Sequence, residues 1–87
     1  MIRIFSGGDI MQKGFMYIDE TIKLNFDMPD ELREYVKGMD KAFEENDTVS
    51  WDFYHEAVGS LAKGFYNMGL ITSRQMHDVW ERYGTAG

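Results

Sequence analysis

Three segments with helical periodicity follow one another after Pro29, and together they cover most of the rest of the chain. Apolar residues recur every three or four positions in each segment, which is the spacing of one face of an α-helix. The pattern predicts helices over about residues 29–45, 51–68 and 73–83. The residues expected to form their shared core are Leu32, Val36, Met39, Phe43, Val58, Leu61, Phe65, Val79 and Trp80.

Local signals predict where the first two helices begin. Proline suits the first helical position, so Pro29 marks the start of the first helix. A polar break over residues 46–48 separates the two segments. We expect Ser50 to cap the second helix, with Val49 and Tyr54 in contact as a hydrophobic staple.

The turn into the third helix carries the clearest local signal of the chain. Thr72 and Gln75 have capping-box spacing, Ile71 is placed to contact Met76, and Gly69 suits the position just after a helix. A tight turn into a helix at residue 73 is therefore predicted.

Small residues stand one turn apart in the first two helices, namely Gly38 with Ala42, and Gly59 with Ala62. Glycine inside a helix costs up to about 1 kcal/mol relative to alanine, so its presence indicates close packing between helices.

The residues before Pro29 predict extended structure. Ile2 and Ile4 alternate with a polar residue, and the segments 15–18 and 21–26 flank Asp19-Glu20, which predicts a β hairpin or ribbon. Asp-Glu is a poor two-residue hairpin turn, because such turns favour glycine or asparagine. Met11 and Met16 are alternative start sites, which would make residues 1–15 a loosely attached extension. The expected fold class is α+β, an N-terminal hairpin followed by a three-helix bundle.

Composition narrows the class of protein. The 87 residues are 28% charged and 44% hydrophobic, which is typical of one soluble globular domain covering residues 1–87. The absence of cysteine excludes disulfides and thiolate metal sites. No apolar stretch approaches the roughly 20 residues that span a bilayer, and the N-terminus has no secretory apolar region. We therefore expect a cytoplasmic protein that does not associate with membranes.

Catalytic and metal-binding motifs are missing. His55 is not followed by the second histidine of a zinc-protease motif, and His77 lies on another predicted helix. The acidic run 44–48 lacks the alternating ligands of an EF-hand loop, and the glycines at 7 and 8 are not followed by a Gly-Lys-Ser/Thr ending. We expect no enzyme activity, no metal and no cofactor.

Acidic residues concentrate in the middle of the chain. Between Asp19 and Glu56 twelve acidic residues stand against four basic ones, a net charge of −8. Such a surface repels nucleic-acid phosphates and favours a basic protein partner, although ordinary solubility explains it equally well. The residues predicted to bind the partner are Asp27, Asp30, Glu31, Glu34, Glu44, Glu45, Asp47 and Asp52.

Aromatic residues make up 15% of the chain, more than a small core obviously needs. Large rings are enriched in protein interfaces, but they also let a short chain fill its interior. Both interpretations stay open for the rings near predicted helix ends and flanks, which are Trp51, Phe53, Tyr66, Trp80 and Tyr83.

The layout of residues 21–58 resembles the ribbon-helix-helix regulators: a strand, a helix of about four turns that starts at a proline, a polar break and a serine-capped helix. The resemblance implies an intertwined dimer whose strands contact the DNA major groove through Thr21, Lys23 and Asn25. The chain departs from the family because this face has one basic residue and the following helix is acidic, which removes most phosphate attraction. DNA binding is therefore the alternative function.

In composition alone, the chain resembles small acidic inhibitors from phages and mobile elements, including anti-CRISPR proteins and DNA mimics. Such proteins present carboxylates where the basic groove of a target expects phosphates. We therefore expect a small acidic, non-enzymatic protein-binding domain, an inhibitor of this kind, that engages a basic, nucleic-acid-binding surface of its partner. Whether the chain is a monomer or a homodimer stays open.

Overall fold

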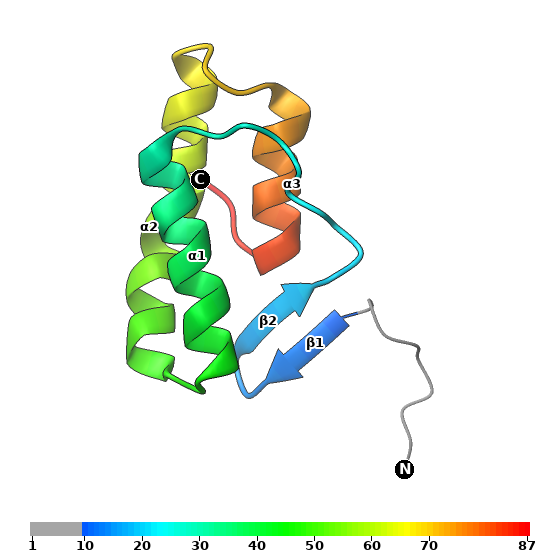
Figure 1. Ribbon diagram of the computed structural model, residues 1–87, viewed down its shortest axis with the longest axis vertical. Coiled ribbons are helices and arrows are strands. Elements are labelled where there is room, and N and C mark those ends of the chain that lie inside the picture. Colours follow the sequence, from blue (N-terminus) through cyan, green and yellow to red (C-terminus); the bar gives the residue numbers. More distant parts are fainter. Residues whose placement is uncertain (1–9) are drawn as a thin grey trace.

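The computed structural model describes residues 10–87, which form a two-stranded hairpin followed by three helices (Figure 1). The antiparallel strands are β1 (Ile10–Lys13) and β2 (Met16–Asp19). The helices are α1 (Asp30–Glu44), α2 (Thr48–Asn67) and α3 (Ser73–Tyr83). The predicted fold class, α+β with an N-terminal hairpin and three helices, is confirmed. The strand predicted from Ile2 to Ile4 lies outside the described residues.

The hairpin turns at Gly14-Phe15 rather than at Asp19-Glu20. Lys13 pairs with Met16 across the turn, and Gly14 has a φ of +61° while Phe15 does not have a positive φ. A glycine with positive φ at the first turn position is the pattern of a type II′ hairpin. The predicted pairing of segments 15–18 and 21–26 is therefore wrong, because residues 16–19 pair with the strand before them.

Residues 20–29 form an irregular connection from β2 to α1 (Figure 1). Their apolar and polar side chains still alternate in burial, since Leu24 and Phe26 pack against the core while Lys23 and Asn25 are exposed. In place of a strand ladder, Arg82 of α3 donates a 2.9 Å hydrogen bond to the Ile22 carbonyl. The alternation in the sequence thus reflects one buried face and not strand pairing.

Two of the three predicted helix starts are confirmed. Helix α1 begins at Asp30, within one residue of the prediction, and Pro29 is its N-cap rather than its first helical residue. Before α3, the Thr72 hydroxyl accepts a 3.1 Å hydrogen bond from the Gln75 amide, and the Gln75 side chain accepts one of 2.8 Å from the Thr72 amide. This reciprocal pair is the predicted capping box, and it satisfies two backbone donors that the first turn leaves free.

The start of α2 differs from the prediction. Asp47, and not Ser50, is its N-cap: one carboxylate oxygen accepts a 3.1 Å hydrogen bond from the Ser50 amide, and the other accepts one of 2.7 Å from the Ser50 hydroxyl. Val49 is 79% exposed, so the predicted contact with Tyr54 does not form a staple. Aspartate and serine are comparable caps, and the helix begins at the earlier one.

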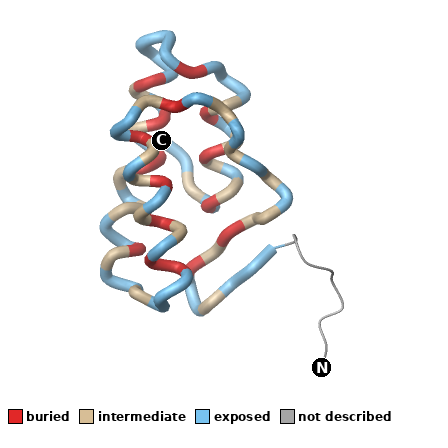
Figure 2. Tube along the Cα trace, in the orientation of Figure 1, coloured by how far each residue is buried: buried red, intermediate tan, exposed pale blue. Residues whose placement is uncertain are grey.

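The core lies between the helices and extends to the hairpin, as the buried segments in Figure 2 show. Seven of the nine predicted core residues are buried, while Leu61 and Trp80 are half-buried against them. Trp51 and Tyr83 are 2% and 0% exposed, and their rings meet edge to face at 6.2 Å. The core interpretation is therefore correct for these two rings. Other buried residues, absent from the predicted core set, are Met16, Ile18, Met28, Ala42, Ala62, Ile71 and Met76.

Candidate functional site

Helix α1 has α2 on one side and the 20–29 connection on the other, and its acidic residues are divided between the two sides. Glu31 and Glu45 lie on the α2 side. Glu31 borders a shallow groove with Phe65 and Met68 of α2, and Glu45 borders another with Tyr54. The predicted acidic residues therefore do not form a single cluster.

Glu44 illustrates the division most clearly. It lies beside Asp40 and Arg82 on the hairpin side of α1, although it directly precedes Glu45 in the sequence. Successive helical residues project about 100° apart, because the helix has 3.6 residues per turn. Glu44 and Glu45 consequently belong to different surfaces.

The other predicted binding residues are exposed at scattered positions. Asp27 lies on the connection, where its carboxylate is 3.4 Å from Nη2 of Arg33. Asp30 and Glu34 are exposed on α1, and Glu34 directly precedes Tyr35. Asp52 precedes Phe53 on α2.

The carboxylate of Asp47 has a structural role as the N-cap of α2. Its pKa is lowered because the Ser50 amide and hydroxyl donate hydrogen bonds to the ionised carboxylate. Both carboxylate oxygens are therefore occupied in capping α2. The sequence pattern alone grouped this residue with the acids available to a partner.

An aromatic cluster lies between the acidic residues on the α2 side of α1. Phe53 is 62% exposed and stacks on Tyr35 at a centroid distance of 6.3 Å. Tyr54 meets Tyr35 edge to face at 5.4 Å and Phe53 at 5.1 Å. Val49 stands one turn before Phe53 on the same side of α2.

We name this surface the α1–α2 face and define it by Glu31, Glu34, Tyr35, Glu45, Val49 and Phe53. The three glutamates were predicted to bind a partner, Phe53 was one of the rings left open between core and interface, and Val49 was predicted to form a staple. The four-residue spacing of Val49 and Phe53 was the sequence signal that could have indicated this face, since residues at that spacing share one side of a helix.

The three positions matched to the ribbon-helix-helix pattern, Thr21, Lys23 and Asn25, are exposed on the connection. This segment is not a strand in the single chain. The Thr21 amide and hydroxyl both donate to Asp19, at 3.0 and 2.6 Å, which continues the turn after β2.

Both histidine rings lie beside backbone carbonyls. Nε2 of His55 is 3.2 Å from the Tyr83 oxygen, and its ring stacks on Trp51 at 5.7 Å. Nδ1 of His77 is 2.9 Å from the Ser73 oxygen. Within residues 10–87, no three histidine, aspartate or glutamate side chains gather closely enough to hold a metal ion. None of the described helices has the length and apolarity needed to cross a membrane.

Comparison of the chain with protein-family models, with curated proteins and with solved structures found no match.

Proposed function

We propose that the chain is a non-enzymatic protein-binding domain whose α1–α2 face binds a basic surface of a protein partner. The observation that carries this proposal is the exposure of Phe53, a large ring that is 62% accessible and is flanked by acidic residues. The sequence motifs support the non-enzymatic class, because none of them assembles a nucleophile, a base or a phosphate-binding loop.

The aromatic cluster has the properties of an interface anchor. A few large rings supply most of the binding energy in many protein interfaces, and Phe53 offers such a ring. Tyr35 and Tyr54 hold it in place through the stacked and edge-to-face contacts, so little side-chain freedom is lost when a partner covers it. Val49, 79% exposed, extends the apolar area by one helical turn.

The acidic residues supply the selectivity for a basic partner. Glu31 and Glu34 are exposed on α1, and Glu45 is exposed at its C-cap, where it borders a groove with Tyr54. Opposite charges across an interface accelerate association and discriminate against acidic partners. Lys41 is also exposed on this helix and offsets part of the charge. We therefore assign the affinity mainly to the rings and the association rate mainly to the acids.

We further propose that the chain inhibits its partner. A basic surface that attracts these carboxylates is of the kind that binds nucleic-acid phosphates, and the chain would occupy it in competition with nucleic acid. The net charge of −8 between Asp19 and Glu56 supports this form, as does the compositional similarity to phage and mobile-element inhibitors.

The test uses a partner captured from the native host and then purified, with association and dissociation measured by surface plasmon resonance. Phe53→Ala is expected to raise Kd at least tenfold, mainly through faster dissociation. Glu45→Lys is expected to slow association and to reduce its salt dependence. Glu44→Lys is the matched control, because it makes the same charge change in the same helical turn on the other side of α1.

Equal effects of Glu44→Lys and Glu45→Lys would show that overall charge, and not the α1–α2 face, governs binding. An unchanged Kd for Phe53→Ala would remove this surface from the interface. The inhibitory form makes a separate prediction, namely that a duplex or single strand bound by the partner is displaced by the chain. A ternary complex with nucleic acid still bound would contradict that form and leave the protein-binding proposal standing.

A further inference from the structure

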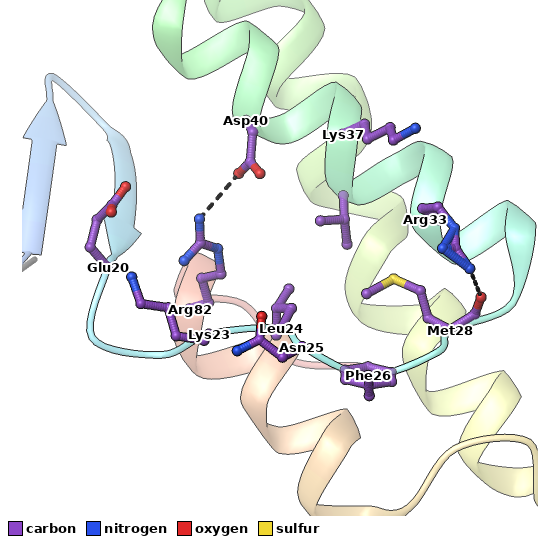
Figure 3. A pocket seen from close by; sticks show the side chains of 11 residues that line it. Glu20, Lys23, Leu24, Asn25, Phe26, Met28, Arg33, Lys37, Asp40 and Arg82 are labelled. Carbon is purple, nitrogen blue, oxygen red and sulfur yellow. Dashed lines mark hydrogen bonds and ion pairs between the residues drawn. The ribbon is translucent and has the colours of Figure 1, made fainter.

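A cleft of about 330 Å³ opens between α1, the 20–29 connection and the end of α3 (Figure 3). It lies on the opposite side of α1 from the α1–α2 face. Small-molecule sites in proteins have volumes of about 300–1,000 Å³, so the cleft is large enough for a small ligand.

The charge of the cleft is opposite to that of the chain. Four of the nine lysines and arginines line it, namely Lys23, Arg33, Lys37 and Arg82, against two carboxylates, Glu20 and Asp40. The whole chain has a formal net charge of −6. Folding therefore gathers basic residues from three separate parts of the sequence into one cleft on an acidic protein.

The two ends of the cleft differ in their balance of charge (Figure 3). Both carboxylates lie at the end near Arg82, where Nη2 of Arg82 is 3.6 Å from Asp40. Arg33 and Lys37 lie at the other end, where neither carboxylate of the cleft is present. This second end is the cationic end of the cleft.

Arg33 and Lys37 are four residues apart on α1, a spacing at which like charges repel. Arg33 is held in place, since its Nη2 donates a 2.7 Å hydrogen bond to the Met28 carbonyl. Its only carboxylate partner within residues 10–87 is the exposed Asp27, at 3.4 Å, and Lys37 forms no ion pair with a carboxylate of those residues. An anion placed beside both side chains would relieve their repulsion, and it would meet a guanidinium that the hydrogen bond to Met28 already fixes in position.

Apolar side chains also line the cleft: Val36 from α1, and Leu24, Phe26 and Met28 from the connection. Met28 lies next to Arg33 (Figure 3). Val36 and Met28 are buried, while Leu24 and Phe26 are half-buried against the core. A ligand in this position would therefore touch an apolar surface directly beside the cationic end.

We propose that this cleft binds a small organic anion with an apolar body. Its carboxylate or comparable head group lies beside Arg33 and Lys37, and its body covers Val36 and Phe26. Charge and apolar surface act together in this site, because the cationic end is exposed to water and would hold a small inorganic anion only weakly. The proposal does not depend on the proposed function, since the residues of the two surfaces are different.

The experiment titrates the ¹⁵N-labelled chain with 2-naphthoate and follows the backbone amides by NMR. Two further probes separate the contributions of charge and apolar contact. 2-Naphthamide has the same apolar body without the charge, and inorganic phosphate has charge without an apolar body. We expect saturable shifts for residues 24–28 and 33–37 with 2-naphthoate, and at least tenfold weaker binding of each of the other two probes. Equal affinity for 2-naphthamide, or no saturable shift of these residues, would overturn the proposal.

A matched pair of variants tests the cationic end. Lys37→Gln is expected to weaken 2-naphthoate binding about tenfold. Lys41→Gln removes the same charge one turn further along α1, outside the cleft, and is expected to change the affinity less than twofold. Equal losses in the two variants would show that the ligand responds to the general field of the protein, and would contradict a site at Arg33 and Lys37.

Discussion

Tyr83 of α3 donates a 2.7 Å hydrogen bond to Oδ1 of Asp40 on α1, and the tyrosine is completely buried. Arg82 joins the same network: its Nε donates to the Tyr83 hydroxyl at 3.2 Å. Burial raises the pKa of Tyr83 far above its usual value, and the neighbouring Asp40 carboxylate raises it further. The last helix is thus connected to the first through a phenol that stays protonated in the folded state.

This network predicts a loss of stability at alkaline pH. Because the pKa of Tyr83 is higher in the folded than in the unfolded chain, its contribution is complete below the unfolded value near pH 10 and is lost as the pH rises above it. Tyr83→Phe should lower the free energy of unfolding by about 1–2 kcal/mol at pH 7 and should flatten the decline between about pH 9 and 11. Urea denaturation at several pH values measures both effects. Tyr66→Phe, at an exposed position, should retain the decline of the wild type, and a similarly steep decline in Tyr83→Phe would contradict this explanation.

A pair of glycine substitutions tests the packing of α1 on α2. A Cβ added to Gly38 would lie 2.5 Å from ring atoms of Tyr54, so Gly38→Ala must displace a ring that Tyr35 and Phe53 hold. We expect a net loss of about 1–2 kcal/mol. Gly64→Ala meets nothing within 4 Å and should stabilise α2 by about 0.5–1 kcal/mol. Thermal melts of the two variants should therefore shift in opposite directions, and shifts of the same sign would show that Gly38 is not closely packed.

The cap of α2 predicts a different dependence on pH. The pKa of Asp47 is lowered in the folded state, so its contribution to stability is present above the unfolded value near pH 4 and is lost as the pH falls through the folded value. Asp47→Asn should keep the cap at neutral pH and should remove the loss of stability that protonation of Asp47 causes at acid pH, because asparagine caps helices without titrating. Asp47→Ala should lower the melting temperature already at pH 7. An Asp47→Ala variant with the wild-type melting temperature would show that the cap contributes no stability.

Trp51 and Phe53 should respond oppositely to truncation, although they are two residues apart. Trp51 is 2% exposed between Phe43 and Tyr83, so Trp51→Ala should cost about 3–5 kcal/mol and unfold much of the chain. Phe53→Ala should change stability by about 0.5 kcal/mol or less, because the ring is mainly in water. Circular dichroism during chemical denaturation gives both values. A large loss of stability in Phe53→Ala would show that the Phe53 ring contributes to the folded core and would weaken its assignment to an interface.

Interactions close in sequence account for the features that could be predicted. The capping box of Thr72 and Gln75 joins residues three positions apart, and the start of α1 depends on Pro29 and the periodic segment after it. Such signals lie within one or two helical turns, so the sequence presents them without knowledge of the fold. The start of α2 was misplaced because Asp47 and Ser50 are both good caps, and the choice depends on how α1 ends and the chain turns.

The strand pairing depended on competition between segments. Residues 21–26 alternate as a strand does, but the partner of residues 16–19 is the preceding strand, since Gly14 adopts the positive φ that closes the turn. The alternation of apolar and polar residues over 21–26 nevertheless corresponds to one face of this segment that packs against the core. Periodicity therefore indicated which side chains turn inward, whereas pairing required a second strand whose position only the folded chain defines.

The three helices, most of their core residues and the acidity of the middle segment follow from the sequence, because periodicity and charge are local properties of the chain. Which side of α1 each charge occupies depends on the tertiary structure. The folded chain places Glu44 on the hairpin side and Glu45 on the α2 side, buries Trp51 while leaving Phe53 in water, and uses Asp47 as a helix cap. It also brought Lys23, Arg33 and Arg82 into one cleft, although up to 59 positions separate them in the sequence. A surface is formed by elements that meet in space, and the orientation of each helix about its axis follows from the packing of its buried face.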